Sequence, residues 1–341
     1  MRQPRGLRRA LVLVVLAVLA GGFYAGGRSA PEIDPTQLAA SALARTDAAT
    51  YVAEVVTVTR HEGKLLTARA RVYRRGASER IEYSEEPGAG VWSITRDGRS
   101  YTFLPAEDRL LISETDHLLS TSDREKLLLS NYRAVYSGAE SVAGREAHVV
   151  DLTPRRSGRP RKRLWIDARR QTVLRSVDYS SGGDRRGSMR VARIRYDAPV
   201  PDKMFTVPRN ARVQRVNVCA SVRRGDLAKV LGFGVSLPGY VPKGYVLEGV
   251  HLFTSQCNCR HKAAQLNYTD GLNVISIFQA PRMTNCDPEV CNMRDDDDGS
   301  GCRMGGCEMA RMGQVSRGNK VVVVVGDLLS GDIKRIAESV R

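Results

Sequence analysis

The sequence has few aromatic residues and lacks the common motifs of hydrolytic catalysis. Aromatic residues make up 6% of the 341 positions, and two of them are tryptophan. None of the five histidines lies in a His-Glu-x-x-His zinc motif, and no Gly-x-Ser-x-Gly nucleophile motif occurs. The composition also excludes collagen-like, coiled-coil and polytopic membrane proteins. We therefore expect a binding protein rather than an enzyme, with no catalytic residue and no cofactor.

Long hydrophobic runs are scarce too, and the one at residues 10–25 directly follows a basic start with several arginines. A basic segment followed by an apolar one is typical of a signal peptide. The run is short for a membrane span, which needs about 20 residues, and an uncleaved signal-anchor is the alternative. No cysteine follows the run until Cys219, so a lipoprotein anchor is not expected. Residues 1–30 are predicted to place the rest of the chain in the periplasm, at the outer side of the cytoplasmic membrane, either secreted through the signal or anchored by it.

Acidic residues are too few to balance the basic ones, and the formal net charge is +16. The excess is spread along the chain, but one short stretch is especially basic. It contains Arg155, Arg156, Arg159, Arg161, Lys162 and Arg163. The stretch lies between two predicted strands, so it is either a solvated turn or a contact for anionic lipid headgroups or an acidic partner segment. Nucleic acid is not expected, because the chain is exported and no aromatic platform accompanies the arginines.

Period-two patterns dominate the first part of the exported chain. Short segments between residues 51 and 196 alternate polar and apolar residues and are separated by turn signals. Helices are predicted over 35–52 and 122–131, the second with Ser122 as its N-cap. The fold is therefore expected to be mainly β with some α+β character. Residues 31–207 should form an open half-barrel of antiparallel strands with helices and an apolar concave face.

The remaining residues, 208–341, predict a smaller α+β domain. Its strands are expected at 245–253, 262–268, 274–279 and 320–326, ahead of a terminal helix at 331–340. An insertion rich in cysteine and methionine occupies residues 283–312.

Six cysteines are grouped in three pairs, two of them within this insertion and one ahead of the strands predicted at 262–268 and 274–279. They are Cys257, Cys259, Cys286, Cys291, Cys302 and Cys307. Export favours disulfides between the pairs, since a bridge within Cys-x-Cys is strained. The alternatives are a soft or borderline metal, which the neighbouring methionines would suit, and free or mixed thiols. No metal is firmly predicted.

Three segments of the second unit occur together in an order that resembles a known family. They are Val-Pro-Lys-Gly-Tyr at 241–245, Leu-Asn-Tyr-Thr-Asp-Gly-Leu-Asn-Val-Ile-Ser-Ile-Phe at 266–278, and Val-Val-Val-Val-Val-Gly-Asp at 321–327. The order is similar to the C-terminal domain of the MucB/RseB family of periplasmic sigma-factor regulators. That family has a Leu-Pro-x-Gly-Phe turn, a Tyr-Ser-Asp-Gly-Leu hairpin and a Val-Val-Gly-Glu strand. This chain departs from the pattern at Tyr245, Thr269 and Asp327, among other positions.

The first unit resembles the N-terminal domain of the same family, which shares the half-barrel of the LolA/LolB lipoprotein carriers. The supporting segments are 102–105, 136–145, 164–167 with Leu174, and 202–208. The resemblance implies an apolar cavity that takes lipid or lipoprotein, although inward-facing apolar residues are also what core packing requires. The candidate lining residues are Val52, Val56, Val58, Trp92, Leu104, Trp165 and Leu174, of which the first three share a face by period two.

The resemblance also implies a function. The leading hypothesis is an extracytoplasmic regulatory protein that binds a transmembrane anti-sigma factor and shields it from proteolysis, while the half-barrel senses a lipid or lipoprotein. The first alternative is a lipoprotein or lipid carrier of the LolA type. The second is a metal- or redox-linked exported binding protein that uses the cysteine- and methionine-rich insertion.

Overall fold

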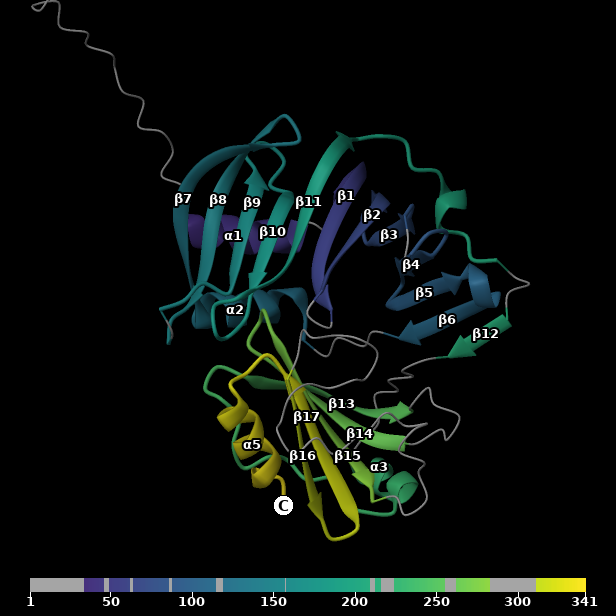
Figure 1. Ribbon diagram of the computed structural model, residues 1–341, viewed down its shortest axis with the longest axis vertical. Coiled ribbons are helices and arrows are strands. Elements are labelled where there is room, and N and C mark those ends of the chain that lie inside the picture. The colour runs from purple at the N-terminus through teal and green to yellow at the C-terminus, as the bar shows by residue number, and fades with distance from the viewer. Residues whose placement is uncertain are drawn as a thin grey trace, which may run out of the picture. The chain divides into compact units, whose positions relative to one another are not determined.

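The computed structural model describes most of the chain after residue 33. The described residues are 34–45, 49–61, 64–85, 88–114, 119–156, 158–208, 212–215, 224–254, 262–282 and 311–341. The chain divides into Met1–Asp34 and a compact unit, Pro35–Arg341, to which the described helices and strands belong. More than half of the described residues lie in strands, and the strands form two sheets (Figure 1).

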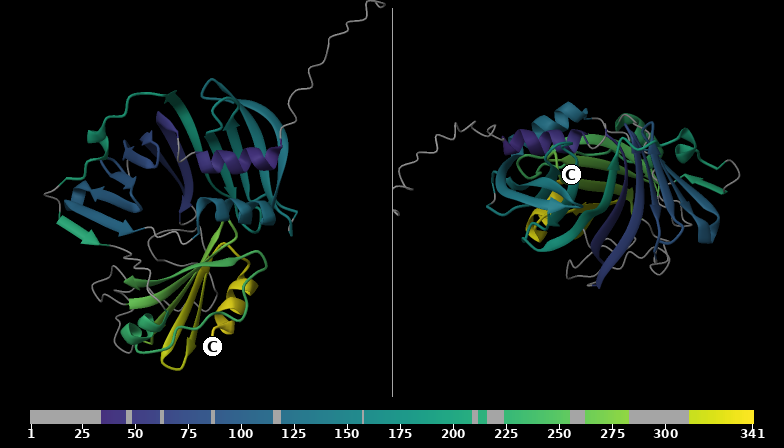
Figure 2. Two further views of the ribbon diagram at one scale, coloured as in Figure 1. Left: turned by 180° about the vertical axis from the view of Figure 1, so that it is seen from behind. Right: turned by 90° about the horizontal axis from the view of Figure 1, so that it is seen from above.

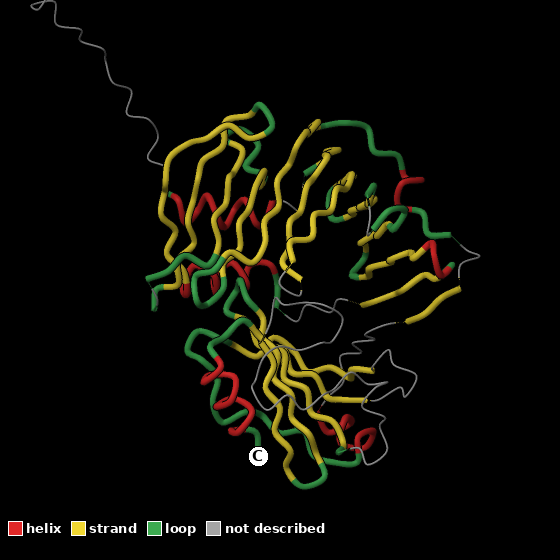
Figure 3. The backbone as a smooth tube through the Cα atoms, in the orientation of Figure 1, coloured by secondary structure: helices red, strands yellow, loops and turns green. Residues whose placement is uncertain are grey.

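The first sheet has twelve strands in the order β12-β6-β5-β4-β3-β2-β1-β11-β10-β9-β8-β7. Their bounds are β1 (Thr50–His61), β2 (Lys64–Arg75), β3 (Ser78–Tyr83), β4 (Trp92–Arg96), β5 (Arg99–Leu104), β6 (Arg109–Glu114), β7 (Tyr132–Val142), β8 (Arg145–Pro154), β9 (Lys162–Asp167), β10 (Val173–Tyr179), β11 (Arg185–Tyr196) and β12 (Arg212–Arg215). The strands pair antiparallel except for β12, which runs parallel to β6. Because β7 and β12 stand at opposite ends of this order, the sheet is open (Figure 3).

The long central strand β1 shows why this chain forms sheet. β-Branched residues dominate it, and their stiff side chains pack well on a pleated surface. Alternation directs Tyr51 and Ala53 into the core, where both are buried. The opposite face of β1 is polar in part, because Glu54 stands between Arg71 of β2 and Arg193 of β11. Period two therefore separates a core face from a charged face.

Two helices cover one face of the strands β7 to β9 (Figure 2). Leu38, Ala39 and Ala42 of α1 (Pro35–Arg45) are buried in one cluster with residues of β7, β8 and β9 and with Leu128 of α2 (Thr121–Asn131). Burial of apolar side chains against the sheet stabilises both helices, which are short for independent helix formation. The helices therefore depend on the sheet that they cover.

Both helices differ from the predictions at their ends. The helix predicted over 35–52 ends at Arg45, and strand β1 begins at Thr50, where β-branched residues take over. The predicted N-cap Ser122 is wrong, because Ser120 caps α2: its hydroxyl accepts the Asp123 backbone N–H at 3.1 Å. Ser120 has the extended backbone of an N-cap, so the N-cap lies two residues before the predicted one.

The proline-containing segment after β11 packs on the sheet. Val200 and Phe205, the latter at the end of the 3₁₀ helix η2 (Asp202–Phe205), are buried against Ile94 of β4. The Arg75 guanidinium donates to the Val200 carbonyl oxygen at 3.0 Å and pairs with Asp202. This segment therefore covers part of the sheet before the chain reaches β12.

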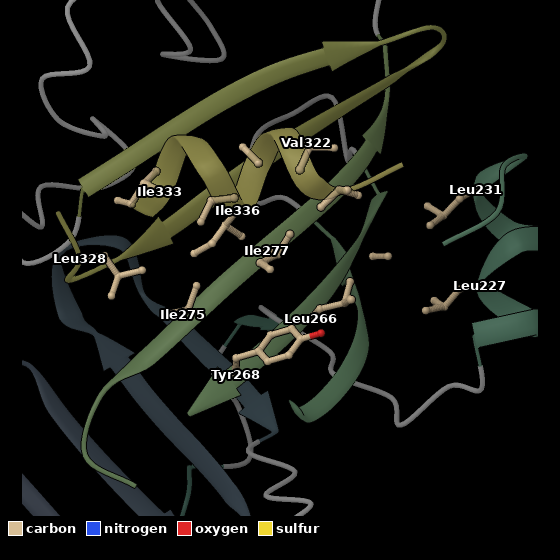
Figure 4. Packing of buried hydrophobic residues seen from close by; sticks show 14 residues of the cluster. Leu227, Leu231, Leu266, Tyr268, Ile275, Ile277, Val322, Leu328, Ile333 and Ile336 are labelled. Atoms are coloured by element: carbon tan, nitrogen blue, oxygen red, sulfur yellow. The ribbon is translucent and has the colours of Figure 1, made fainter. Parts of the chain in front are cut away.

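The second sheet has five strands in the order β13-β14-β15-β17-β16. Its elements are β13 (Val246–Thr254), β14 (Lys262–Thr269), β15 (Val274–Pro281), β16 (Arg311–Arg317) and β17 (Lys320–Gly326), with helices α3 (Arg224–Leu231) and α5 (Ser330–Ser339). Ile333 and Ile336 of α5 and Leu227 of α3 join the apolar side chains of the strands in one core (Figure 4). The amphipathic terminal helix therefore closes one face of this sheet.

The predicted fold class is confirmed. The chain has an open, mainly antiparallel sheet with few helices, and a smaller sheet that packs with helices in an α+β arrangement. None of the helices in the described ranges has the length and apolar character that a membrane crossing requires.

Candidate functional site: the junction between the two sheets

Three loops of the second sheet contact the first sheet, and each belongs to one of the sequence segments that carry the family resemblance. The loop before β13 contributes Gly244, the β14–β15 turn contributes Asp270 and Gly271, and the residue after β17 is Asp327. We call this set of contacts the junction. The three motifs are therefore close in space as well as characteristic in sequence.

A buried hydrogen-bond network forms the centre of the junction. Tyr132, at the start of β7, is 2% exposed, and its hydroxyl donates to the Asp270 Oδ2 atom at 2.6 Å. The same hydroxyl accepts from the Asn273 Nδ2 atom at 2.7 Å. Burial and then the Asp270 carboxylate raise the pKa of Tyr132 far above its ordinary value, so it stays a neutral donor. The network joins residues about 140 positions apart in the chain.

Asp270 also organises its own turn. Its Oδ1 atom accepts the backbone N–H groups of Leu272 at 2.9 Å and Asn273 at 2.7 Å. The next residue, Gly271, has φ of +94°, which a residue with a side chain adopts only at a cost. A Cβ atom on Gly271 would lie 2.6 Å from the Leu128 backbone nitrogen of α2. The Asp-Gly pair is thus required both by the turn and by its close approach to α2.

Asn131, the last residue of α2, contacts two loops at once. Its Nδ2 atom donates to the Gly244 carbonyl oxygen at 2.8 Å and to the Asp270 carbonyl oxygen at 3.0 Å. Gly244 has φ of +99°, and a Cβ atom there would lie 2.4 Å from the Asn131 Oδ1 atom. The neighbouring Tyr245 has a pKa well above its ordinary value because of burial and the nearby Asp270 carboxylate. Gly244 and Gly271 therefore both have a backbone conformation and a close approach that favour glycine.

An ion-pair cluster forms the second part of the junction. The Asp327 carboxylate pairs with Arg161, which is 8% exposed, and with Arg186, whose Nη2 atom lies 3.1 Å from Oδ1. The Ser181 backbone N–H donates to the same carboxylate at 3.3 Å. Elsewhere in the junction Arg124 of α2 pairs with the buried Glu248 of β13, and burial lowers the pKa of Arg124. Buried charges of both signs thus face each other across the two sheets.

The structure separates the six basic residues of the predicted anionic contact into two groups. Arg161, Lys162 and Arg163 are paired with Asp327, Asp178 and Asp151 respectively. Arg155, Arg156 and Arg159 are exposed, and Arg159 donates to the Gly182 carbonyl oxygen. Only the second group has its charge on the surface. Whether this surface contacts an anion stays a prediction.

The predicted lipid-contact residues lie in several places. Trp165 and Leu174 are buried in one core cluster, whereas Val52 and Trp92 pack against another, with Trp92 stacked on Phe103 at 5.4 Å. The remaining three, Val56, Val58 and Leu104, are half-buried. By register Val56 shares its face with Arg69 and Arg190. The structure thus brings them together only in pairs, and their role as a lipid site stays a prediction.

The six candidate cysteines, like Cys219, lie outside the described residues, so the disulfide and metal alternatives stay predictions. Within the described ranges no group of three or more His, Cys, Asp or Glu side chains is arranged to hold a metal ion.

Comparisons with known proteins bear on both sheets. The model of the MucB/RseB N-terminal domain matches residues 44–208. Residues 44–208 are a MucB/RseB N-terminal domain. The resemblance found in the sequence is thereby confirmed, and it is this MucB/RseB domain that supplies Tyr132, Asn131 and Arg161 to the junction. A search of curated proteins finds no match.

Solved structures extend the likeness to the second sheet. The chain is similar in fold to a structure of the Pseudomonas aeruginosa MucA/MucB complex, with a TM-score of 0.62 and 18% sequence identity. The likeness covers 91% of this chain and 99% of that chain. For MucB in complex with MucA(peri) the TM-score is 0.61 and the identity 19%, with 90% of this chain and 98% of that chain covered. For MucB alone the TM-score is 0.56 and the identity 18%, with the same coverage of 90% and 98%. The fold of those proteins therefore includes both sheets of this chain.

The sequence motifs marked the junction loops, but sequence reasoning did not assign them a contact. Tyr132, Asn131 and Arg186 were not singled out at all, because nothing local in the sequence shows what a residue touches across the fold. The signal that could have found one side of the junction was the Thr-Asp-Gly-Leu-Asn turn, whose Asp-Gly pair is typical of a tight turn with positive φ.

Proposed function

We propose that this chain is an extracytoplasmic regulator that binds the periplasmic part of a transmembrane anti-sigma factor. The observation that carries the proposal is the MucB/RseB domain at 44–208 together with a fold likeness to MucB over both sheets. Two of the similar solved structures contain MucB bound to MucA or MucA(peri). The sequence starts with a basic segment that an apolar run follows, and this order supports export of the remaining residues to the periplasm.

The junction supports a binding role for the two sheets acting together. Its buried hydrogen bonds and ion pairs are satisfied only when the loops of the second sheet lie against α2 and β7. A partner that contacts both sheets would then meet a preorganised surface, which lowers the entropic cost of binding. We propose that partner binding uses the second sheet and its contact with the first.

The test is affinity purification of the full-length chain from its own host after cross-linking in the cell, with the partners identified by mass spectrometry. We expect recovery of a single-pass membrane protein with a cytoplasmic sigma-binding domain. Cells that carry the untagged chain provide the control. Recovery of mature lipoproteins or lipids in place of such a protein would support the carrier alternative and overturn the regulator proposal.

A further inference from the structure

A hollow of about 330 Å³ lies at the start of the edge strand β7, and arginines surround it. Its lining residues are Arg133, Pro154, Arg155, Arg156 and Gly158. Arg133 belongs to β7, while Arg155 and Arg156 follow the end of β8, which pairs with β7. We call it the three-arginine hollow. The pairing of β7 with β8 brings three arginines to the lining of one hollow.

The positive charge of the hollow is not neutralised within the described part of the chain. No ion pair joins Arg133, Arg155 or Arg156 to an acidic residue there. Arg155 donates from Nε and Nη2 to the Leu129 carbonyl oxygen, at 3.4 and 3.3 Å, which holds its side chain beside the end of α2. Guanidinium groups present paired donors whose geometry matches a carboxylate. The hollow is therefore suited to an oxyanion.

Exposed apolar side chains continue from the hollow along β7. Val135 and Tyr136 are 42% and 41% exposed, and β7 is the last strand of the sheet on that side (Figure 1). Arginine beside tyrosine and aliphatic side chains is the composition typical of the centre of a protein interface. A small free anion would contact only the arginines. An extended polypeptide would use the arginines and the apolar positions together.

The hollow also adjoins the junction. A Cβ atom on Gly244 would lie 3.2 Å from the Arg156 Nη1 atom, so Arg156 lies beside the second sheet's motif loop. Asn131, which binds Gly244, immediately precedes β7, and its carbonyl oxygen accepts the Arg155 backbone N–H at 2.8 Å. A ligand in the hollow would therefore contact residues whose positions depend on how the two sheets meet.

We propose that an acidic segment of the protein partner binds along the start of β7, with its carboxylates in the three-arginine hollow and its apolar side chains against Val135 and Tyr136. This proposal rests on the proposed function and specifies where and by what chemistry the partner is held. Long-range attraction between the cationic rim and an acidic segment would also speed association at low salt.

The experiment compares two triple variants of the full-length protein. R133A/R155A/R156A removes the hollow's charge, and R190A/R193A/R195A removes the same charge from exposed positions on β11. The ligand is the extracytoplasmic segment of the membrane protein that the wild-type chain recovers. We expect about a ten- to hundredfold loss of affinity in the first variant, and less than about a threefold loss in the second. The salt dependence of binding should decrease only in the first.

The location is tested with a photo-crosslinking amino acid at position 135, and at position 193 as the matched control. Cross-links from position 135 should map next to acidic residues of the same partner, and position 193 should give none. Equal affinity loss in the two triple variants, or cross-links from position 193 alone, would overturn the proposal while leaving the proposed function in place. If the wild-type chain binds no such membrane protein, both fail.

Two further probes separate the acidic segment from other anions. Inorganic phosphate at constant ionic strength should not displace the bound segment, and phosphatidylglycerol vesicles should bind both triple variants equally. Displacement by phosphate, or vesicle binding that R133A/R155A/R156A alone abolishes, would assign the hollow to a phosphate group and overturn the proposal. Each probe uses the same purified proteins, so the comparisons are direct.

Discussion

At the scale of single residues, the junction depends on buried polar groups that pair with one another across the two sheets. A buried hydrogen bond contributes little by itself, but removing one partner leaves the other without a substitute from water. Tyr132, Asp270 and Asn273 form such a set, because Asp270 and Asn273 each lose a hydrogen bond if the phenol oxygen of Tyr132 is removed. Single atoms can therefore decide how firmly the two sheets are held.

We predict that Tyr132→Phe lowers the free energy of unfolding by about 1–3 kcal/mol, since the Asp270 Oδ2 and Asn273 Nδ2 atoms each lose their bond to the phenol oxygen and are left with the 3.2 Å hydrogen bond between them. Chemical denaturation of the purified protein measures this change. The control is Tyr136→Phe, which alters an exposed tyrosine and should stay within about 0.5 kcal/mol. Equal effects of the two substitutions would contradict the role given to the network.

A second prediction concerns pH. Burial opposes ionisation of Asp167, but the Arg145 guanidinium and the backbone N–H groups of Arg170 and Arg169 outweigh it and hold the pKa of Asp167 below its ordinary value of 3.8. A carboxyl whose pKa is lower in the folded protein stabilises it at pH values above the ordinary pKa. That stabilisation is lost as pH falls through the lowered pKa.

The wild-type protein should therefore exceed Asp167→Asn in unfolding free energy by about 2 kcal/mol at neutral pH, and the difference should shrink as pH falls below about 4. Denaturation curves of both proteins between neutral pH and pH 3 measure it. A difference that is constant over this range would show that the charge of Asp167 is not responsible.

At the scale of elements, the β14–β15 turn and α2 fit together only because Gly271 has no side chain. Gly271→Ala would place a Cβ atom 2.6 Å from the Leu128 backbone nitrogen. Alanine would also have to adopt the positive φ of this position, which residues with a side chain disfavour. We predict a loss of at least about 2 kcal/mol in unfolding free energy. Gly225→Ala in α3 is the control, because no atom lies within 4 Å of the added group. A tolerated Gly271→Ala would show that the turn does not pack closely on α2.

An element could be predicted from the sequence where neighbouring residues determine it, and not where pairing with a distant strand does. The strand at 320–326 is a run of valines with a turn at each end, and its predicted bounds equal the observed ones. Strand β12 has no such pattern over its four residues and exists through parallel pairing with β6, about 100 positions earlier. No strand is predicted at β16, because its first two residues fall in the insertion predicted at 283–312 and its polar residues resemble a loop. Tertiary pairing decided both cases.

The candidate site shows the same limit at the level of side chains. The basic run was recognisable, but Arg155 and Arg161 look alike in the sequence, and only the fold pairs Arg161 with Asp327 and leaves Arg155 exposed. Arg133 was not connected with the run, since it lies two strand lengths away in sequence and reaches the hollow only through the β7–β8 pairing. Contacts of this kind are non-local, so a single sequence does not reveal them.

At the scale of the whole molecule, the buried ion pair across the junction should couple the two sheets. Asp327→Ala would leave the buried Arg161 without its carboxylate, which costs about 3–5 kcal/mol for pairs of this kind. We predict that hydrogen exchange accelerates in both contact regions, around residues 158–163 and 326–329. The control is Asp202→Ala, which breaks the exposed pair with Arg75 and should cost less than about 1 kcal/mol. Acceleration confined to 326–329 would show that the sheets are not coupled through Asp327.

At this scale we propose that the chain binds the extracytoplasmic part of a membrane protein and shields it from proteolysis. The most direct test is the half-life of the membrane protein recovered with the chain, followed by immunoblot after synthesis is stopped, in cells with and without this gene. The account predicts that the partner is degraded faster without the chain and that the wild-type gene restores its half-life. An unchanged half-life in cells that lack the chain would contradict the account.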